Sequence, residues 1–306
     1  MKKIGFIGVG KMGNPMSMNL LKAGFELTIY DVNRDAMQNL ISRGVNASKS
    51  PREVAEVSDV VLTCLPSPEA LEEVVLGEDG VFEGIEEENI FIDLGSTDPG
   101  TIRKIGECLK QKGVEMLDAP VNGGVEGAEA GTLTIMAGGK KETFEKCSKI
   151  FQSIGEKIFY IGELGTGSVV KIVNNLIGMC SVAAVVEGLA LGVKAGVDSK
   201  TLYEVVKTGS AGQGKTLEWI CQRIAKGDYE AGFKISLVRK DLGLAHKLGK
   251  EMGVPLFMTN TADQIFSLAQ AKDLEEKDTV AIALLYENLL KIKWGEETLS
   301  QIFNNQ

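Results

Sequence analysis

Lys3–Gly13, with the sequence KIGFIGVGKMG, has the pattern of a buried strand that runs directly into a glycine-rich turn. The turn has the spacing Gly8-x-Gly10-x-x-Gly13, and a helical pattern follows over Met12–Lys22. The first glycine permits a tight turn, the second lets a pyrophosphate approach the backbone, and the third lets the helix pack against the strand. Strand, turn and helix together predict a dinucleotide-binding fold. The residues expected to contact the cofactor here are Gly8, Val9, Gly10, Lys11, Met12 and Gly13.

Asp31 is the candidate ligand for the ribose of the dinucleotide, because it ends a second expected strand, Glu26–Tyr30, eighteen residues after Gly13. A carboxylate at this place accepts hydrogen bonds from ribose hydroxyls and repels a 2′-phosphate, which favours NAD as the cofactor. Arg34 follows closely and could bind a 2′-phosphate, so NADP is the less favoured alternative. The structural alternative for Asp31 is an aspartate that caps the turn.

Strand patterns continue through the first half of the chain and stop near Gly165. Further strands are expected at Asp59–Leu65, Ile90–Asp93, Val114–Leu117, Thr132–Ala137 and Lys157–Ile161, with helices between them. This alternation indicates a parallel sheet, with ligands beyond the carboxyl ends of its strands. Helices are then expected at Val169–Ala195, Lys200–Lys207, Lys215–Lys226, Ser236–Glu251, Leu256–Ala271 and Thr279–Ile292. The sequence predicts an α/β protein with a Rossmann-type parallel-sheet domain at residues 1–164 and an all-helical C-terminal domain at residues 165–306, which begins with a long interdomain helix.

Lys171, Asn174 and Asn175 lie at helical spacing i, i+3 and i+4, so they share one face of the first of these helices. A lysine can give a proton to an alkoxide or take one from an alcohol when its pKa is lowered toward the working pH. Asparagines beside it can hold a substrate or the lysine itself. The alternative from this stretch alone is a polar stripe on an exposed helix face.

Composition narrows the classes of function. The chain has 306 residues and a net charge of −9, which argues against nucleic acid or an anionic membrane as partner. No apolar run reaches the roughly 20 residues of a membrane span, and no signal peptide precedes the first strand. The expectation is a cytoplasmic protein that holds anionic ligands through local positive features.

Cysteine and histidine patterns give no sign of a disulfide or a metal site. The five cysteines, at positions 64, 108, 147, 180 and 221, form no CxxC pair and fall inside expected strands or helices. The single histidine, His246, falls on a helix beside Lys247 and is expected to be partly exposed. No bound metal is expected.

Four motifs in this order make the chain resemble the β-hydroxyacid dehydrogenases, a family that includes 3-hydroxyisobutyrate dehydrogenase and tartronate semialdehyde reductase. The motifs are IGVGKMGNPM at residues 7–16, DAPVNGG at 118–124, GTGSVVKIVNN at 165–175 and KDL at 240–242. The resemblance covers nearly the whole chain. It implies an active site between a Rossmann-type domain and a helical domain.

The resemblance also assigns roles to residues. It implies a catalytic group of Lys171, Asn175 and Asn174. Further cofactor contacts are expected at Leu65, Pro66, Thr97 and Lys240, and substrate contacts at Ser96, Asn122, Gly123, Gly124 and Phe233. In similar proteins, Asp241 also lies near the site.

The loop at 122–124 departs from the family in one position, because Asn122 stands where the family usually has serine. Asparagine still donates a hydrogen bond to a carboxylate, but it is larger and carries an additional acceptor. The backbone N–H groups of Gly123 and Gly124 are suited to hold an anion, although two glycines also suit a plain tight turn. The resemblance therefore does not define the shape of the pocket near the substrate, and it leaves the identity of the substrate open.

The expected function is an NAD(H)-dependent oxidoreductase that interconverts a small β-hydroxy acid and its semialdehyde, with a small carboxylate-bearing substrate. An imine reductase on the same scaffold is the first alternative, and Lys171 argues against it because such relatives typically replace that lysine. A non-catalytic dinucleotide-binding protein is the second alternative, and the intact lysine and substrate loop argue against it. The long apolar helix over Ile172–Val193 favours a homodimer or homotetramer.

Overall fold

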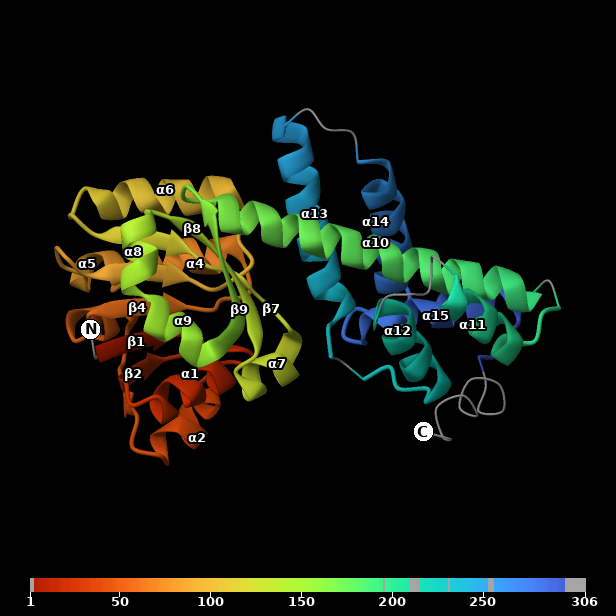
Figure 1. The fold of residues 1–306 in the computed structure, drawn as a ribbon, viewed down its shortest axis with the longest axis horizontal. Helices are drawn as coiled ribbons and strands as arrows, with labels where there is room; N and C mark the ends of the chain where they lie inside the picture. The colour runs from red at the N-terminus through yellow and green to blue at the C-terminus, as the bar shows by residue number, and fades with distance from the viewer. Residues whose placement is uncertain (1–2, 195, 210–214, 231, 253–255, 295–306) are drawn as a thin grey trace. The chain divides into compact units, whose positions relative to one another are not determined.

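The computed structural model describes residues 3–194, 196–209, 215–230, 232–252 and 256–294. The chain divides into two compact units, Met1–Ile172 and Val173–Gln306. The first unit is a sheet with helices and the second consists of helices (Figure 1), which confirms the predicted fold class. The division falls inside the long helix α10 (Thr166–Lys194), so its first turns belong to the first unit and the rest to the second.

The sheet of the first unit is built on short apolar strands. Six of them run parallel: β1 (Lys3–Ile7), β2 (Glu26–Tyr30), β3 (Asn46–Ala47), β4 (Val60–Thr63), β5 (Ile90–Asp93) and β6 (Glu115–Asp118). Three more strands complete the sheet: β7 (Val121–Asn122), β8 (Leu133–Gly139) and β9 (Gly155–Gly162). The order is β3-β2-β1-β4-β5-β6-β8-β7, and β9 pairs with β8.

The sheet is mostly parallel, and strand β8 departs from that direction. This strand runs antiparallel to β6 and β7, and β9 then runs parallel to β8. The connection between β7 and β8 is the seven-residue helix α7 (Gly124–Ala130) with its flanking turns. A parallel pair needs a crossover of about a dozen residues or more, so the chain returns in the opposite direction.

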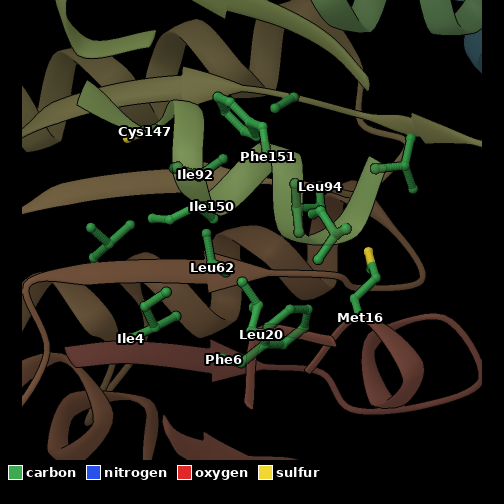
Figure 2. Packing of buried hydrophobic residues seen from close by; sticks show 14 of the residues in the cluster. Ile4, Phe6, Met16, Leu20, Leu62, Ile92, Leu94, Cys147, Ile150 and Phe151 are labelled. Atoms are coloured by element: carbon green, nitrogen blue, oxygen red, sulfur yellow. The ribbon is translucent and has the colours of Figure 1, made fainter. Parts of the chain in front are cut away.

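Helices cover both faces of the sheet because its strands are apolar on both sides. On one face, Met16 and Leu20 of α1 pack with Phe6, Leu62 and Phe151 (Figure 2). On the other face, Ile7, Val61 and Phe91 pack against α3–α6. The helices of this unit are α1 (Gly13–Lys22), η1 (Arg34–Met37), α2 (Gln38–Ile41), α3 (Pro51–Glu56), α4 (Pro68–Leu76), α5 (Val81–Gly84), α6 (Pro99–Lys110), α7, α8 (Lys141–Lys146) and α9 (Ser148–Ile154).

The second unit has its own core of residues from several helices, among them Tyr203, Ile220, Leu242, Phe266 and Ile282. After α10 its elements are α11 (Ser199–Thr208), α12 (Lys215–Ala225), α13 (Ile235–Met252), α14 (Phe257–Gln270), η2 (Thr279–Ala281) and α15 (Ile282–Leu290). Each helix predicted from the sequence has a counterpart here, with its ends within a few residues.

Helix α10 is unusually apolar. Its window Thr166–Ala183 is long and apolar enough to cross a membrane by length and composition alone, contrary to the expectation that no segment reaches that length. One such helix is weak evidence for a membrane span; 28% of this window is buried, and Val182 and Ala183 at its end, with Leu189 beyond it, belong to the core of the second unit.

Candidate functional site

The glycine-rich turn between β1 and α1 has room for a ligand at one of its three glycines. A Cβ atom added to Gly8, whose φ is +89°, would lie 2.5 Å from the carbonyl oxygen of Cys64, and one added to Gly13 would lie 1.9 Å from the carbonyl oxygen of Gly8. At Gly10 an added Cβ would meet no atom within 4 Å. The fold itself therefore requires Gly8 and Gly13. The open space at Gly10 fits a dinucleotide whose pyrophosphate approaches the backbone.

Asp31, directly after β2, is hydrogen-bonded to this turn. Its Oδ2 accepts the Val9 N–H at 2.9 Å, and its Oδ1 accepts the Asn33 N–H at 2.8 Å. The turn-capping role that the sequence left as an alternative is thus present. A carboxylate oxygen accepts more than one hydrogen bond, so both oxygens keep acceptor capacity for ribose hydroxyls. Arg34 is exposed at the start of η1.

The carboxyl end of β5 is organised by Asp93, which is buried. Its Oδ1 accepts the Thr63 hydroxyl at 2.8 Å and the Gly95 N–H at 3.2 Å, and its Oδ2 accepts the Thr97 hydroxyl at 3.0 Å. Thr97 is buried and Ser96 half-buried. The loop expected to contact cofactor and substrate is therefore anchored by an aspartate that the sequence analysis did not single out.

The remaining cofactor candidates of the first unit lie at the end of β4. Leu65 is half-buried and packs against the core on one face of the sheet, and its Cδ2 would lie 2.9 Å from a Cβ at Gly8. Pro66 is exposed. Ser67 then accepts the Ala70 N–H at 3.2 Å and caps α4, so a helix begins directly after the strand.

Asn122, Gly123 and Gly124 lie where β7 ends and α7 begins. Asn122 is exposed and pairs with Thr134 of β8, so it belongs to a strand and its backbone position is fixed. Gly123 and Gly124 have φ of +133° and +65°, which favours glycine at both positions. A Cβ at Gly124 would meet nothing within 4 Å. The amide of Asn122 and the open space at Gly124 are compatible with a small ligand.

Asp118, at the end of β6, holds the start of α10. It is fully buried, and its two carboxylate oxygens accept the N–H groups of Gly165 and Ser168, each at 2.7 Å. Burial raises the pKa of Asp118 to about 6, and these two backbone hydrogen bonds oppose the rise. Lys171 is half-buried in the second turn of this helix. The sequence analysis quoted Asp118 within a motif but gave it no role.

Two predicted site residues of the second unit, Asn175 and Lys240, contact one buried acid, Asp241, and a third, Asn174, contacts Asn175. The Asn175 Nδ2 donates to Asp241 Oδ2 at 2.7 Å, and the Lys240 Nζ lies 3.2 Å from Asp241 Oδ1. The Asn174 Nδ2 donates to Asn175 Oδ1 at 3.3 Å. The structure therefore brings Asn174, Asn175 and Lys240 together, from α10 and α13.

Phe233 is held by its backbone on the loop before α13. Its N–H donates to Asp278 Oδ2 at 3.0 Å, and its carbonyl oxygen accepts both the N–H and the hydroxyl of Thr279 at 2.8 Å. Asp278 is fully buried and forms an ion pair with Arg223 at 3.4 Å. The ring of Phe233 is therefore presented from a fixed backbone.

The described residues contain no group of three or more His, Cys, Asp or Glu side chains that could hold a metal ion. His246 is half-buried on α13. Within each unit, the polar groups at the predicted site residues are lysine, amides, hydroxyls and buried carboxylates, which suit proton transfer and hydrogen bonding to a small polar ligand.

The chain is similar to dehydrogenases over nearly its whole length. Residues 3–162 match the family model described as the NAD binding domain of 6-phosphogluconate dehydrogenase, and residues 165–286 match that described as NAD-binding of NADP-dependent 3-hydroxyisobutyrate dehydrogenase. The 2-(hydroxymethyl)glutarate dehydrogenase of Eubacterium barkeri is 39% identical over 288 residues, covering 94% of this chain and 95% of the relative.

Two 3-hydroxyisobutyrate dehydrogenases are similar as well. That of Pseudomonas aeruginosa is 36% identical over 294 residues, covering 94% of this chain and 99% of the relative. The solved structure of the Mycobacterium tuberculosis 3-hydroxyisobutyrate dehydrogenase with L-serine has a TM-score of 0.86 and 29% identity, and the match covers 93% of this chain and 99% of that one.

Proposed function

Because the chain belongs to the β-hydroxyacid dehydrogenase family, we propose that it interconverts a small β-hydroxy acid and its semialdehyde with NAD(H), using Lys171 as general acid and base. The observation that carries the proposal is the placement of Lys171 on α10, one turn before Asn174 and Asn175 and one turn after the residues that Asp118 caps. A lysine so held can exchange a proton with a ligand oxygen.

The cofactor is proposed to be NAD, held mainly by the first unit. The turn from Gly8 to Gly13 would bind the pyrophosphate through backbone N–H groups, with the open space at Gly10 on the side of the ligand. Asp31 would accept from the ribose hydroxyls. Leu65, Pro66 and Thr97 would lie along the rest of the dinucleotide, and Lys240 is proposed as a further cofactor-binding residue. The bound nicotinamide supplies a hydride acceptor or donor.

Lys171 would move the proton. In the reducing direction its ammonium protonates the oxygen that becomes the alcohol, and in the oxidising direction the neutral amine removes that proton. Asn175 gives one N–H to Asp241, which leaves its second N–H for the substrate. In this proposal Lys171 transfers the proton, and Asn175 orients the substrate through a hydrogen bond.

The substrate is proposed to carry a carboxylate on the carbon next to the reacting carbon, as a β-hydroxy acid does. Gly123 and Gly124 would bind that carboxylate through backbone N–H groups, and the exposed amide of Asn122 would donate to it. Ser96 and Phe233 are proposed as further substrate-binding residues. The names of the relatives agree with this class, since 2-(hydroxymethyl)glutarate and 3-hydroxyisobutyrate are both β-hydroxy acids.

Absorbance of the reduced nicotinamide tests the proposal. The full chain would be assayed with semialdehydes, β-hydroxy acids and imines, each with NAD(H) and with NADP(H). Turnover of semialdehydes with NADH, and of β-hydroxy acids with NAD, supports it. Turnover of imines alone would favour an imine reductase. NADH binding without any turnover would favour a non-catalytic protein. A higher kcat/KM with NADPH would reassign the cofactor to NADP and favour Arg34 as a ligand of its 2′-phosphate.

A further inference from the structure

The cap at the start of α10 comes from the sheet rather than from the helix's own flanking residues. N–H groups in the first turn of a helix lack partners within the helix. Asp118 accepts the N–H of Ser168, in the first turn, and that of Gly165, directly before the helix, although it lies 50 and 47 residues earlier in the chain. An ordinary cap fixes only where a helix begins, whereas this one also ties α10 to the carboxyl end of β6.

Glycines let the first turn of α10 lie directly against the sheet. A Cβ added to Gly167 would lie 2.1 Å from the carbonyl oxygen of Met136 and 2.8 Å from that of Asp118. One added to Gly138 would lie 2.5 Å from Asp118 Oδ1. Real Cβ atoms do not approach oxygen atoms so closely, so the start of α10 packs tightly against β6 and β8 and leaves no space for a larger side chain at these two glycines.

Lys171 follows Ser168 by three residues, which is about one helical turn, so its backbone is fixed by the same contact. Resting on the function proposed above, we infer that Asp118 is a positioning residue for Lys171: by capping α10 from the end of β6, it places the lysine relative to the carboxyl ends of the strands. Asp118 acts through the helix and needs no contact with the substrate.

The charge of Asp118 also acts on the lysine. The N-terminus of a helix carries partial positive charge, which disfavours an ammonium group, and a carboxylate at that end offsets it. Among the described residues, other charged residues near the cap are Asp93, which is in register with Asp118 on β5, Arg103, which donates to the carbonyl oxygen of Leu164, and Glu163, whose carbonyl oxygen accepts the Thr166 hydroxyl. With these unchanged, loss of the Asp118 charge lowers the pKa of Lys171.

The test compares Asp118→Asn and Asp118→Ala with the wild-type chain in steady-state kinetics. We expect kcat to fall about 10- to 100-fold, the scale of a misplacement of about 1 Å, while KM and the NADH dissociation constant change far less. The limb of the pH profile that reports the lysine should move down by about 0.2–0.7 pH units. Asparagine keeps one acceptor oxygen, so Asp118→Asn should be milder and carries the test if the alanine variant does not fold.

Asp198→Asn is the matched control. Asp198 caps α11 in the second unit by accepting the Thr201 N–H at 2.9 Å, and no predicted reacting group lies on that helix. This variant should keep the wild-type kcat and pH profile. If the pH profile of Asp198→Asn shifted as much as that of Asp118→Asn, the loss of any helix cap would have this effect, and the inference would be overturned.

A double variant separates positioning from a purely structural role. If Asp118 acts through Lys171, Asp118→Asn should cost no further kcat in a Lys171→Ala background. Losses that multiply would overturn the inference, as would a folded Asp118→Asn enzyme with wild-type kcat and pH profile. A Lys171→Ala enzyme with nearly wild-type kcat would refute the proposed role of the lysine instead, and the inference with it.

Discussion

Substitution of alanine at two glycines of the same turn should separate cofactor binding from folding. An added methyl group at Gly10 meets no atom of the chain within 4 Å, and Gly10 does not have positive φ. Gly10→Ala should therefore leave the free energy of unfolding within about 0.5 kcal/mol of wild type. If the pyrophosphate occupies the open space, the methyl group overpacks the bound state by about 1–3 kcal/mol, which weakens NADH binding about 5- to 150-fold.

Gly13→Ala, in contrast, should destabilise the fold itself. Its methyl carbon would lie 1.9 Å from the carbonyl oxygen of Gly8, inside the turn itself, so α1 must move away from β1. A core overpacked in this way loses about 1–3 kcal/mol or more of stability. NADH binding should weaken too, because the turn is distorted.

Urea unfolding without cofactor and a fluorescence titration with NADH measure the two quantities separately. The reasoning would be refuted if Gly10→Ala bound NADH as tightly as wild type, because the dinucleotide would then lie elsewhere. It would equally be refuted if Gly10→Ala unfolded as easily as Gly13→Ala, because the space at Gly10 would then not be open.

Lys171→Ala should lower kcat about 10²- to 10⁴-fold with little change in NADH affinity. Lys171→Arg should restore little of that activity, because a guanidinium does not act as a base. An alanine variant that keeps more than about a tenth of wild-type kcat would contradict the assignment. Asn122→Ser should leave stability and NADH binding close to unchanged, because the side chain is exposed, but it should alter KM or the ranking of substrates. A variant that fails to fold, or that folds poorly with an unchanged ranking, would show that Asn122 serves the fold rather than the substrate. Burial raises the pKa of Asp118 to about 6, so the folded state binds this proton more tightly than the unfolded state does, and the contribution of Asp118 to stability should fall as the pH rises from about 4 to about 6. The difference in unfolding free energy between wild type and Asp118→Asn, followed by urea titration, should shrink by about 3 kcal/mol across that interval, and a difference that grows would contradict it.

Local patterns predicted most of the fold. The strand before Gly8 and the helix after it are visible in sequence because burial on both faces demands continuous apolar residues and the turn demands glycine. The antiparallel strand β8 could not be predicted in the same way. Its direction depends on the short connection through α7 and on pairing with β6 and β7, and neither leaves a periodic signal.

The candidate site shows the same limit. Lys171, Asn174 and Asn175 stand out because helical spacing is a local property. The acids that hold the predicted groups do not stand out, because Asp118 reaches 47 residues along the chain to Gly165 and Asp278 reaches back 45 residues to Phe233. In the sequence Asp118 is only an aspartate at the end of an apolar strand, and Asp278 only one in a charged loop, so neither residue indicates its partner.

The long reach of Asp118 governs where the chain can be cut. A fragment that stops at residue 164, where strand patterns end, would lose both N–H groups that its carboxylate accepts. An unsatisfied buried polar group costs about 1–3 kcal/mol, and more when it is charged, so such a fragment would be destabilised at the carboxyl end of β6. Extending it to Ile172 restores the cap and carries Lys171 with it. The first turns of α10 are in this sense the last part of the dinucleotide-binding unit, and dissection or domain exchange in this protein should keep them there.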